Sequence, residues 1–394
     1  MDKENRPYPM PSPTENLPLT ELAAERLHNF LYRKRADRLR ATALKTPFSD
    51  THERMLLVSQ SARIPQSQIF PYHYFAAALA DTYDVSIRET SLDDMLAGHS
   101  IPHNDATIVA FQTPYDITDD DLERLLDKLR SNSPGARLIY LDWSAPADLR
   151  NAERLNPHID IYIKKHVLRD RGQYGQKTLG DTNLADRYAR RLNIAEEEYC
   201  FDIPAGFLDK LLVGPSFATA PLLLPELAQP FAFGQERSID LHARFTVTGT
   251  DWYQAMRSEA EAALDQFADL QLARGSNLPL YRFICELRRA KVCFSPFGYG
   301  EVCWRDYEAV MTGAVLLKPD MDHIETAPDI FRPWETYVPL SWDLSDFDEA
   351  LQKLLGDAPL RESIARNAHA VLFDYLNSDG FIKQMRPLFS MDMQ

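Results

Sequence analysis

Short apolar runs alternate with helical segments along most of this chain. In the first half, strand-length runs are predicted at 54–60, 83–89, 106–114, 136–143 and 159–165, and helices at 68–82 and 118–134. In the second half, strands are predicted at 239–247, 291–296, 314–319 and 337–340, and helices at 251–267, 279–290, 345–355 and 360–376. Such alternation is typical of βαβ units on a parallel sheet. The pattern therefore predicts an α/β protein with two Rossmann-like halves.

A proline-rich stretch without helical or strand periodicity, residues 213–238, separates the two halves. The predicted divisions are an N-terminal extension, a Rossmann-like acceptor domain, a linker, a Rossmann-like donor domain and a tail: 1–50, 51–215, 216–238, 239–376 and 377–394. At 394 residues the chain is long enough for two cores. Ligands of open parallel sheets bind beyond the carboxyl ends of the strands, so the site is expected in a cleft between the domains.

A long basic helix is predicted before the first strand, at 20–45. Its apolar residues recur near helical spacing: Leu22, Leu27, Phe30, Leu31 and Leu39. The later part of the helix carries a basic cluster: Arg33, Lys34, Arg35, Arg38 and Arg40. A helix of this kind can lie on anionic lipid. We favour packing on the protein's own surface, because the apolar stripe is narrow and lacks tryptophan. Peripheral contact with a membrane is the alternative.

The charge balance narrows the range of partners. The formal net charge is −15 and the isoelectric point is about 5.2, which disfavours nucleic acid as a partner. No apolar run reaches the roughly 18–20 residues that cross a bilayer, and the N-terminus lacks the apolar core of a signal peptide, so a cytoplasmic protein is expected. The four cysteines form no C-x-x-C pair, which favours buried free thiols over a zinc site.

The segment 295–319, SPFGYGEVCWRDYEAVMTGAVLLKP, carries the strongest chemical signal. It follows a predicted strand, and Gly298 and Gly300 allow backbone conformations that other residues avoid. A helix is expected to begin near Val302. Its first amide groups lie at the positive end of the helix dipole, which favours an anion such as diphosphate. Arg305 lies in that first turn, where its planar guanidinium would pair with phosphate oxygens.

Three further residues complete this predicted pocket. Glu308 lies on nearly the same helix face as Arg305, where a carboxylate would accept hydrogen bonds from ribose hydroxyls. Tyr299 and Trp304 supply flat surfaces for a base or a sugar. The alternative is a plain glycine turn in which Arg305 and Glu308 form an i,i+3 salt bridge, worth only about 0.2–0.5 kcal/mol.

This segment resembles the donor-site signature of GT-B glycosyltransferases, especially the exostosin-like and related bacterial families. Their "sP.G.g...R..Ea...G.vPV" pattern is matched by Ser295, Pro296, Gly298, Gly300, Arg305, Glu308, Ala309, Gly313 and Val315. The flanking order of strands and helices extends the resemblance over 239–376, whereas the N-terminal half matches only as a Rossmann-like domain. The resemblance implies a GT-B-like fold, a nucleotide-diphosphate sugar of UDP or GDP type as co-substrate, Glu308 on the ribose and Arg305 on the diphosphate.

One departure from this pattern bears on stereochemistry. Many retaining GT-B enzymes carry two glutamates eight positions apart. The position eight residues before Glu308 is Gly300, and Glu301 is one residue too close. We therefore favour inversion of configuration over retention.

No metal or other cofactor is expected beyond the nucleotide sugar. Arg305 and the helix amides could stabilise the departing nucleotide diphosphate without a metal. The D-x-D sequence at 320–322 stands in the wrong context for a metal motif. Lys318 and His323, at the end of the same predicted strand, are candidates for contact with the donor, and an ordinary surface loop is the alternative for His323.

The catalytic base and the acceptor contacts should come from loops of the N-terminal half. Asp142, at the end of the fourth strand, and His73, in the first helix, are candidates for the base, and a structural role is the alternative for Asp142. Gln60 and Arg63 follow the first strand and Lys165 ends the fifth, which makes them candidates for acceptor binding.

Together these features predict a glycosyltransferase that moves a sugar from a nucleotide-diphosphate sugar to a hydroxyl of a glycan, a glycolipid or a surface-polysaccharide precursor. Two alternatives stay open. One is a non-catalytic protein that binds nucleotide sugars or glycans, and the other is a different GT-B-like enzyme such as an epimerase.

Overall fold

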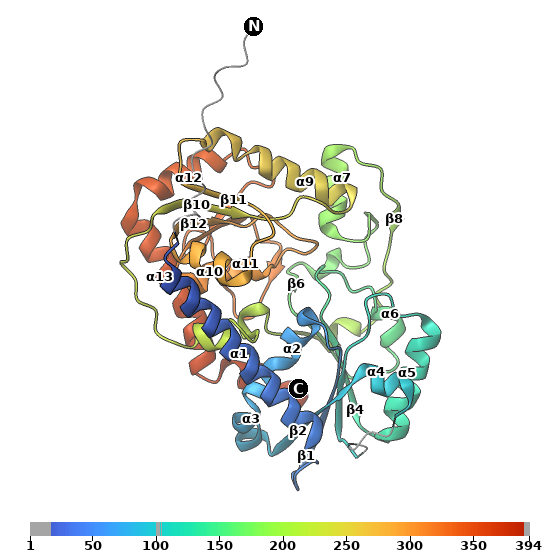
Figure 1. Ribbon diagram of the computed structural model, residues 1–394. Coiled ribbons are helices and arrows are strands. Elements are labelled where there is room, and N and C mark those ends of the chain that lie inside the picture. The colour runs from blue at the N-terminus through green and yellow to red at the C-terminus, as the bar shows by residue number, and fades with distance from the viewer. Residues whose placement is uncertain (1–16, 100–102, 104, 390–394) are drawn as a thin grey trace.

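The computed structural model describes residues 17–99, 103 and 105–389, and it shows two parallel α/β domains (Figure 1). The N-terminal domain is built on a sheet of six parallel strands in the order β2-β1-β3-β4-β5-β9. The strands are β1 (Glu53–Ser59), β2 (Val85–Ser91), β3 (Ile108–Phe111), β4 (Arg137–Asp142), β5 (Ile161–Lys164) and β9 (Leu211–Val213). The helices are α2 (Arg63–Tyr74), α3 (Ala76–Tyr83), α4 (Leu92–Ala97), α5 (Asp119–Asn132), α6 (Ala152–Leu155) and α7 (Asn183–Leu192).

The C-terminal domain has a sheet of five parallel strands in the order β11-β10-β12-β13-β15. Its strands are β10 (Ile239–Arg244), β11 (Leu272–Gly275), β12 (Ala290–Phe294), β13 (Val315–Pro319) and β15 (Val338–Leu340). Its helices are α9 (Asp251–Ala262), α10 (Leu280–Arg288), α11 (Trp304–Thr312), α12 (Phe347–Gly356) and α13 (Ala358–Asn377). The two parallel α/β halves predicted from the alternating pattern are confirmed.

The predicted and observed secondary-structure elements differ mainly where the observed elements are short. The helix predicted at 68–82 is two helices, α2 and α3, which meet at Phe75. Strands β9 and β11 and helix α7 were not predicted. The two strands have only three and four residues, too few to show a period. Helix α7 does show one, because its buried residues Leu184, Ala185, Tyr188 and Ala189 recur at helical spacing, and the prediction missed this signal.

Helix α1 (Leu19–Lys45) packs against both domains. It contacts α10 of the C-terminal domain and α2 and β2 of the N-terminal domain, and Figure 1 shows it running past them. Glu25 pairs with Arg288 at 3.2 Å at one end, and Arg40 pairs with Glu89 at 2.8 Å at the other. The predicted helix is therefore confirmed. Its residues Leu27, Phe30 and Leu31, however, remain more than half exposed, at 54%, 54% and 52%.

Three further connections join the domains. The segment after β15 ends with α14 (Gly380–Gln384), which returns to the N-terminal domain, where Phe381 packs on Tyr72 with ring centroids 5.4 Å apart. The predicted tail is thus partly structured. Strands β6 (Val167–Leu168) and β14 (Ile324–Glu325) form a small antiparallel sheet across the cleft. The predicted linker contains α8 (Leu224–Leu227), whose leucines are buried.

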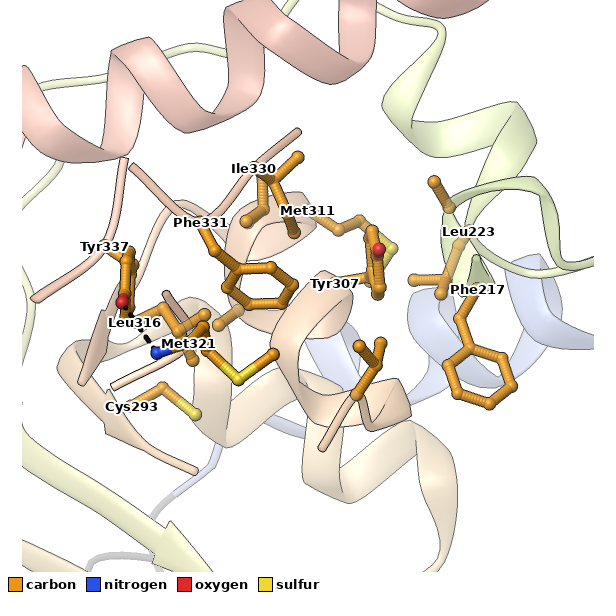
Figure 2. Close-up of a cluster of buried hydrophobic side chains, with 14 of the residues drawn as sticks. Phe217, Leu223, Cys293, Tyr307, Met311, Leu316, Met321, Ile330, Phe331 and Tyr337 are labelled. Atoms are coloured by element: carbon orange, nitrogen blue, oxygen red, sulfur yellow. Dashed lines mark hydrogen bonds between the residues drawn. The ribbon is translucent and has the colours of Figure 1, made fainter. Parts of the chain in front are cut away.

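The back of α11 packs into a hydrophobic cluster that fixes its position (Figure 2). Tyr307 and Met311 of α11 lie between Phe331 on one side and Leu223 of the linker on the other. The Tyr337 hydroxyl accepts a hydrogen bond of 3.1 Å from the Met321 amide and ties the loop after β13 to the same cluster. Burial on this side leaves the N-terminal end of α11 at the domain cleft.

The cysteines are all free, but their burial varies. Cys285 and Cys293 are buried as predicted, whereas Cys200 is exposed and Cys303 is partly exposed. In the part of the chain that the structure describes, no helix is long and apolar enough to cross a membrane.

Candidate functional site

The glycine loop, residues 295–303, leads from β12 to α11 at the carboxyl end of the C-terminal sheet. A side-chain Cβ at Gly300 would lie 1.8 Å from the carbonyl oxygen of Ala145, which follows β4 of the other domain. Glycine is therefore required at this position by close contact between two backbones. Neither Gly298 nor Gly300 has a positive φ. The prediction that both glycines adopt backbone conformations that other residues avoid is therefore wrong.

The N-terminus of α11 is capped by the protein's own carboxylate. The helix begins at Trp304, two residues later than predicted, and Asp306 accepts hydrogen bonds from the Cys303 amide (2.9 Å) and the Ser295 hydroxyl (2.6 Å). The ammonium of Lys318, which is fully buried, lies 3.3 Å from the same carboxylate. A diphosphate at this helix end would share it with Asp306.

The guanidinium of Arg305 holds the glycine loop in place. It donates hydrogen bonds to the Ser295 hydroxyl (3.2 Å), the Arg244 carbonyl (3.1 Å) and the Pro296 carbonyl (3.2 Å). Within the described residues it forms no ion pair with Glu308, so the plain salt bridge considered as an alternative is absent there. These hydrogen bonds hold the Arg305 side chain against the glycine loop, and its pairing with phosphate stays a prediction.

Glu308 is buried against the N-terminal domain. Burial raises its pKa to about 7, and the charges of Arg63 and Arg305 offset this only in part. The cavity beside it measures only about 10 Å³, roughly the space of one water molecule. A ribose could reach Glu308 only if this part of the cleft opened.

Arg257 of α9 lies beside Gly298 and was not identified from the sequence. It is 4% exposed, and its guanidinium contacts the rings of Phe245 and Tyr253 at 5.3 and 5.0 Å. Among the described residues it has no hydrogen-bond partner. Burial, together with the nearby charge of Arg305, lowers its pKa to about 10. The sequence did carry a signal, because Arg257 stands among the apolar positions of the predicted helix 251–267.

Lys165 is the matching cation on the N-terminal side. It is 2% exposed, its Nζ has no hydrogen-bond partner in the described structure, and it lies 4.1 Å from the Phe217 ring. Phe217 stacks in turn on Trp304, with ring centroids 4.6 Å apart. Burial lowers the pKa of Lys165 to about 7. An amine buried in this way is destabilising unless an anion joins it.

Glu301 joins the two domains through histidines. The Nε2 atoms of His166 and His323 lie 3.3 and 3.4 Å from its carboxylate, and the Asn183 amide also donates to it. Burial opposes ionisation of Glu301, but the two histidines outweigh it and hold its pKa below the usual range. The predicted donor residue His323 therefore has a defined partner, and it also lines the interdomain cavity.

That cavity, of about 640 Å³, lies between the domains at the ends of β13 and β15. Residues of both domains line it, among them Tyr174, Asn183, Arg187, Asp320, Asp322, His323 and Trp342. Asp320 and Asp322 of the D-x-D sequence thus line the cavity. The volume is sufficient for a small ligand.

Tyr299 lies on the outer side of the glycine loop. It is 43% exposed, stacks on Tyr253 with centroids 4.4 Å apart, and accepts a hydrogen bond of 3.2 Å from the Thr250 amide. Tyr299 is thus partly exposed, and its contact with a base or a sugar stays a prediction.

Among the candidate residues of the N-terminal domain, Asp142 has a carboxylate that already accepts hydrogen bonds from several donors. Its carboxylate accepts hydrogen bonds from the Ser144 amide (2.9 Å) and hydroxyl (2.5 Å), from the Tyr162 hydroxyl (2.6 Å) and from the Lys164 ammonium (2.7 Å). Burial opposes ionisation, but Lys164 outweighs it and lowers the pKa. A buried carboxylate with four donors is a poor proton acceptor, which favours the structural role for Asp142.

His73 forms a dyad with a buried carboxylate. Its Nε2 lies 2.6 Å from Glu89 Oε2, and Glu89 also accepts from Arg40 and Ser59. These partners outweigh burial and lower the pKa of Glu89. An ionised Glu89 fixes the Nε2–H tautomer of His73 and leaves the Nδ1 lone pair to take a proton.

Gln60 is held by hydrogen bonds within its own domain, whereas Arg63 contacts the other domain. The Gln60 amide donates to the Thr113 carbonyl (2.8 Å) and its backbone amide bonds to Gln112 (3.2 Å), so Gln60 is held internally. The guanidinium of Arg63 stacks over the Trp304 ring at 4.6 Å. Arg63 therefore links the start of α2 to the start of α11.

Two Rossmann-like domains with parallel sheets and a site of charged residues at their cleft define a GT-B-like protein, as predicted. Similar solved structures include an alpha-glucosyltransferase in complex with UDP and a 13-mer DNA (10% identity, 86% of this chain and 100% of that one covered, TM-score 0.49). A glycosyltransferase from Rickettsia africae ESF-5 is 8% identical over 86% of this chain and 98% of that one, with a TM-score of 0.46. TarM is 11% identical over 82% of this chain, which spans only 58% of TarM, with a TM-score of 0.43.

Neither a protein-family model nor a curated protein matches the chain. The chemistry of the site therefore rests on its residues.

Proposed function

We propose that this protein is a glycosyltransferase that moves a sugar from a nucleotide-diphosphate sugar, of UDP or GDP type, to an acceptor hydroxyl. The observation that carries the proposal is the pair of buried cations near the start of α11, Arg257 from one domain and Lys165 from the other. Each lacks a hydrogen-bond partner in the described residues. Burial of an unpaired charge is costly, and a diphosphate between the domains would neutralise both groups.

In the proposed reaction the acceptor oxygen attacks C1 of the donor sugar. The bond between C1 and the phosphate oxygen breaks, and the nucleotide diphosphate leaves with the electron pair. Arg257, Lys165 and Lys318 would stabilise the developing negative charge, so a metal is not required. Arg305 and Asp306 would act indirectly, by holding the glycine loop. A direct displacement of this kind inverts the configuration at C1.

His73 is the better candidate for the base, because its partner Glu89 leaves one ring nitrogen available. Glu308 would bind the ribose, with Tyr299 and Trp304 as flat surfaces for the base or sugar and His323 at the sugar side of the cleft. Since the cavity at Glu308 is small, donor binding would require α11 and α2 to separate, and closure would then exclude water.

Arg257→Gln should weaken nucleotide-diphosphate binding about tenfold to a hundredfold, because a charge-assisted hydrogen bond contributes about 1.5–3 kcal/mol. A thermal-shift screen of UDP, GDP and their sugar conjugates on the wild-type protein first identifies the nucleotide, since a ligand of the folded state raises its apparent stability. Titration of that nucleotide then compares the variants. Arg282→Gln, an exposed arginine of α10, is the matched control. Equal affinity for the nucleotide in all three proteins would contradict the proposed diphosphate site.

The two alternative functions are separated by turnover. Slow hydrolysis of a labelled nucleotide sugar, or transfer of its label to an acceptor, indicates a transferase. Binding without either indicates a nucleotide-sugar or glycan-binding protein, and conversion of the donor to an isomer indicates an epimerase.

For the acceptor we propose a glycan, a glycolipid or a surface-polysaccharide precursor at the cytoplasmic face of a membrane. Leu27, Phe30, Leu31, Lys34 and Arg38 recur at helical spacing along one face of α1, with the apolar residues exposed. An apolar stripe that continues into cations on an otherwise acidic protein is complementary to an anionic bilayer.

Sedimentation with vesicles tests this contact. The wild-type protein should pellet with vesicles containing anionic phospholipid and stay in solution with neutral vesicles, and Phe30→Glu should reduce the pelleted fraction at least threefold by placing a charge in the apolar stripe. Asp50→Glu, a conservative change at an exposed position outside α1, serves as the control. Equal behaviour of the Phe30→Glu variant and the wild type would exclude this face.

A further inference from the structure

A second cavity, of about 380 Å³, lies where α1, α2 and the start of α11 meet. Its walls include Phe70, His73 and Trp304, and three arginines from two elements: Arg33 and Arg40 of α1, and Arg63 of α2. One wall therefore comes from α1, which lies outside both Rossmann-like sheets.

The cavity has more positive than negative charge. Arg33 and Arg63 have no ion pair or hydrogen bond within the described residues, whereas Arg40 is paired with Glu89. Arg33 and Arg63 are both exposed, so a ligand can reach their guanidinium groups from solvent. Asp37 is the one carboxylate among the residues that line the cavity. On a chain of net charge −15, this local excess of free guanidinium groups points to an anionic ligand.

The same cavity contains groups suited to a sugar. The Trp304 ring is stacked against the Arg63 guanidinium and the Phe217 ring, each at 4.6 Å, and His73 lines the wall with its Nε2 held by Glu89 at 2.6 Å. A proton acceptor next to arginines that form no ion pair in the described residues would suit a hydroxylated ligand that carries a negative group. Trp304 is also the first residue of α11, so the cavity adjoins the proposed donor site.

We propose that this cavity is the acceptor subsite and that it takes an anionic sugar, one that carries a phosphate or a carboxylate. The proposal rests on the proposed glycosyltransferase function. Arg33 and Arg63 bind the anionic group, and His73 Nδ1 takes the proton of the hydroxyl that attacks the donor. The proton leaves the acceptor oxygen as that oxygen bonds to C1 of the donor sugar.

Binding to the full-length protein tests the proposal, with glucose 6-phosphate, glucuronate and glucose as probes in the presence of a saturating concentration of the preferred nucleotide. At least one anionic probe should bind at least tenfold more tightly than glucose. Arg33→Glu should remove this preference, whereas Arg26→Glu, at an exposed arginine of the same helix that does not line the cavity, should keep it.

Several outcomes would overturn the assignment. Equal binding of all three probes, or an unchanged preference in Arg33→Glu, shows that the cavity does not select anions. Binding of the anionic probe that is seen without the nucleotide and lost at its saturating concentration shows that the cavity belongs to the donor site. Nucleotide affinity is measured in the same variants: normal nucleotide binding without anion preference refutes only the acceptor subsite, whereas no nucleotide binding by the wild type refutes the proposed function.

Discussion

Glu308→Gln should stabilise the folded protein by about 3 kcal/mol at pH 8 and at the same time abolish measurable nucleotide binding. The pKa of Glu308 is raised from 4.5 to about 7 in the folded protein because the carboxyl is buried. A rise of this size corresponds to about 3 kcal/mol. Glutamine keeps the shape of the side chain and cannot ionise, so it removes this penalty together with the carboxylate proposed to bind ribose.

The sign of the pH dependence follows from proton counting. Between pH 4.5 and about 7 the unfolded chain has released the Glu308 proton and the folded protein still holds it. The wild type therefore loses stability over this range as pH rises, and the loss is constant above it. Urea unfolding at pH 5 and pH 8 should show a larger advantage of Glu308→Gln at pH 8. Glu349→Gln, at an exposed position of α12, is the control. The same advantage at both pH values would show that Glu308 is not buried as a neutral acid.

Lys165→Met should also stabilise the protein, but with the opposite dependence on pH. Burial lowers the pKa of Lys165 from 10.5 to about 7. Below pH 7 the folded protein carries a buried ammonium at full cost, at most about 5 kcal/mol. Between pH 7 and 10.5 the unfolded chain binds the proton and the folded protein does not, so the stability of the wild type rises with pH. Methionine fills similar space without a charge.

The advantage of Lys165→Met should therefore be largest at pH 6 and should shrink by pH 9, as measured by urea unfolding. The variant should also bind the preferred nucleotide at least tenfold more weakly, because a diphosphate would otherwise hold the ammonium. Lys177→Met removes an exposed lysine and controls for net charge. If Lys165→Met is destabilised at pH 6, Lys165 has a partner that the proposed site does not include. Because the Glu308 and Lys165 variants change in opposite directions with pH, a general effect of pH on the protein cannot explain both.

Both Glu308→Gln and Lys165→Met are expected to stabilise the protein, and this shared effect bears on the site. At both positions the folded protein retains an ionisable group that a neutral side chain would replace with a gain in stability. Groups of this kind often serve function, because a stabilising substitution would otherwise be tolerated. Both residues lie near the start of α11, one from each domain.

The chain itself predicted which loop to examine for a site, but it did not predict the contacts that the residues of this loop make. The glycine loop, the strand before it and the helix after it were recognisable because glycine, proline and apolar periodicity act over short distances. Arg305 and Glu308 were expected to face a ligand together. In the structure Arg305 donates hydrogen bonds to the carbonyls of Arg244 and Pro296, and Glu308 lies against Arg63 of the other domain; their contacts with a ligand stay predictions.

The pairings found only in the structure join residues that are distant in sequence. His73 and Glu89 are 16 positions apart, and Glu301 meets His166 across 135 positions. Arg257 and Lys165 are notable for lacking a partner, and that can be judged only when every neighbour is known. Burial and pairing are sums over the whole fold, and no local pattern contains them.

By itself the sequence determined the class of fold, two parallel α/β halves joined by a linker, and the loop where an anion would be sought. Apolar periodicity and turn chemistry are local, and they act in the same way in any chain. Only the tertiary structure decided which charges are paired, which are buried alone, and which helix closes the second cavity. Those properties depend on the packing of one domain against the other, where segments far apart in the chain exclude water from each other's side chains.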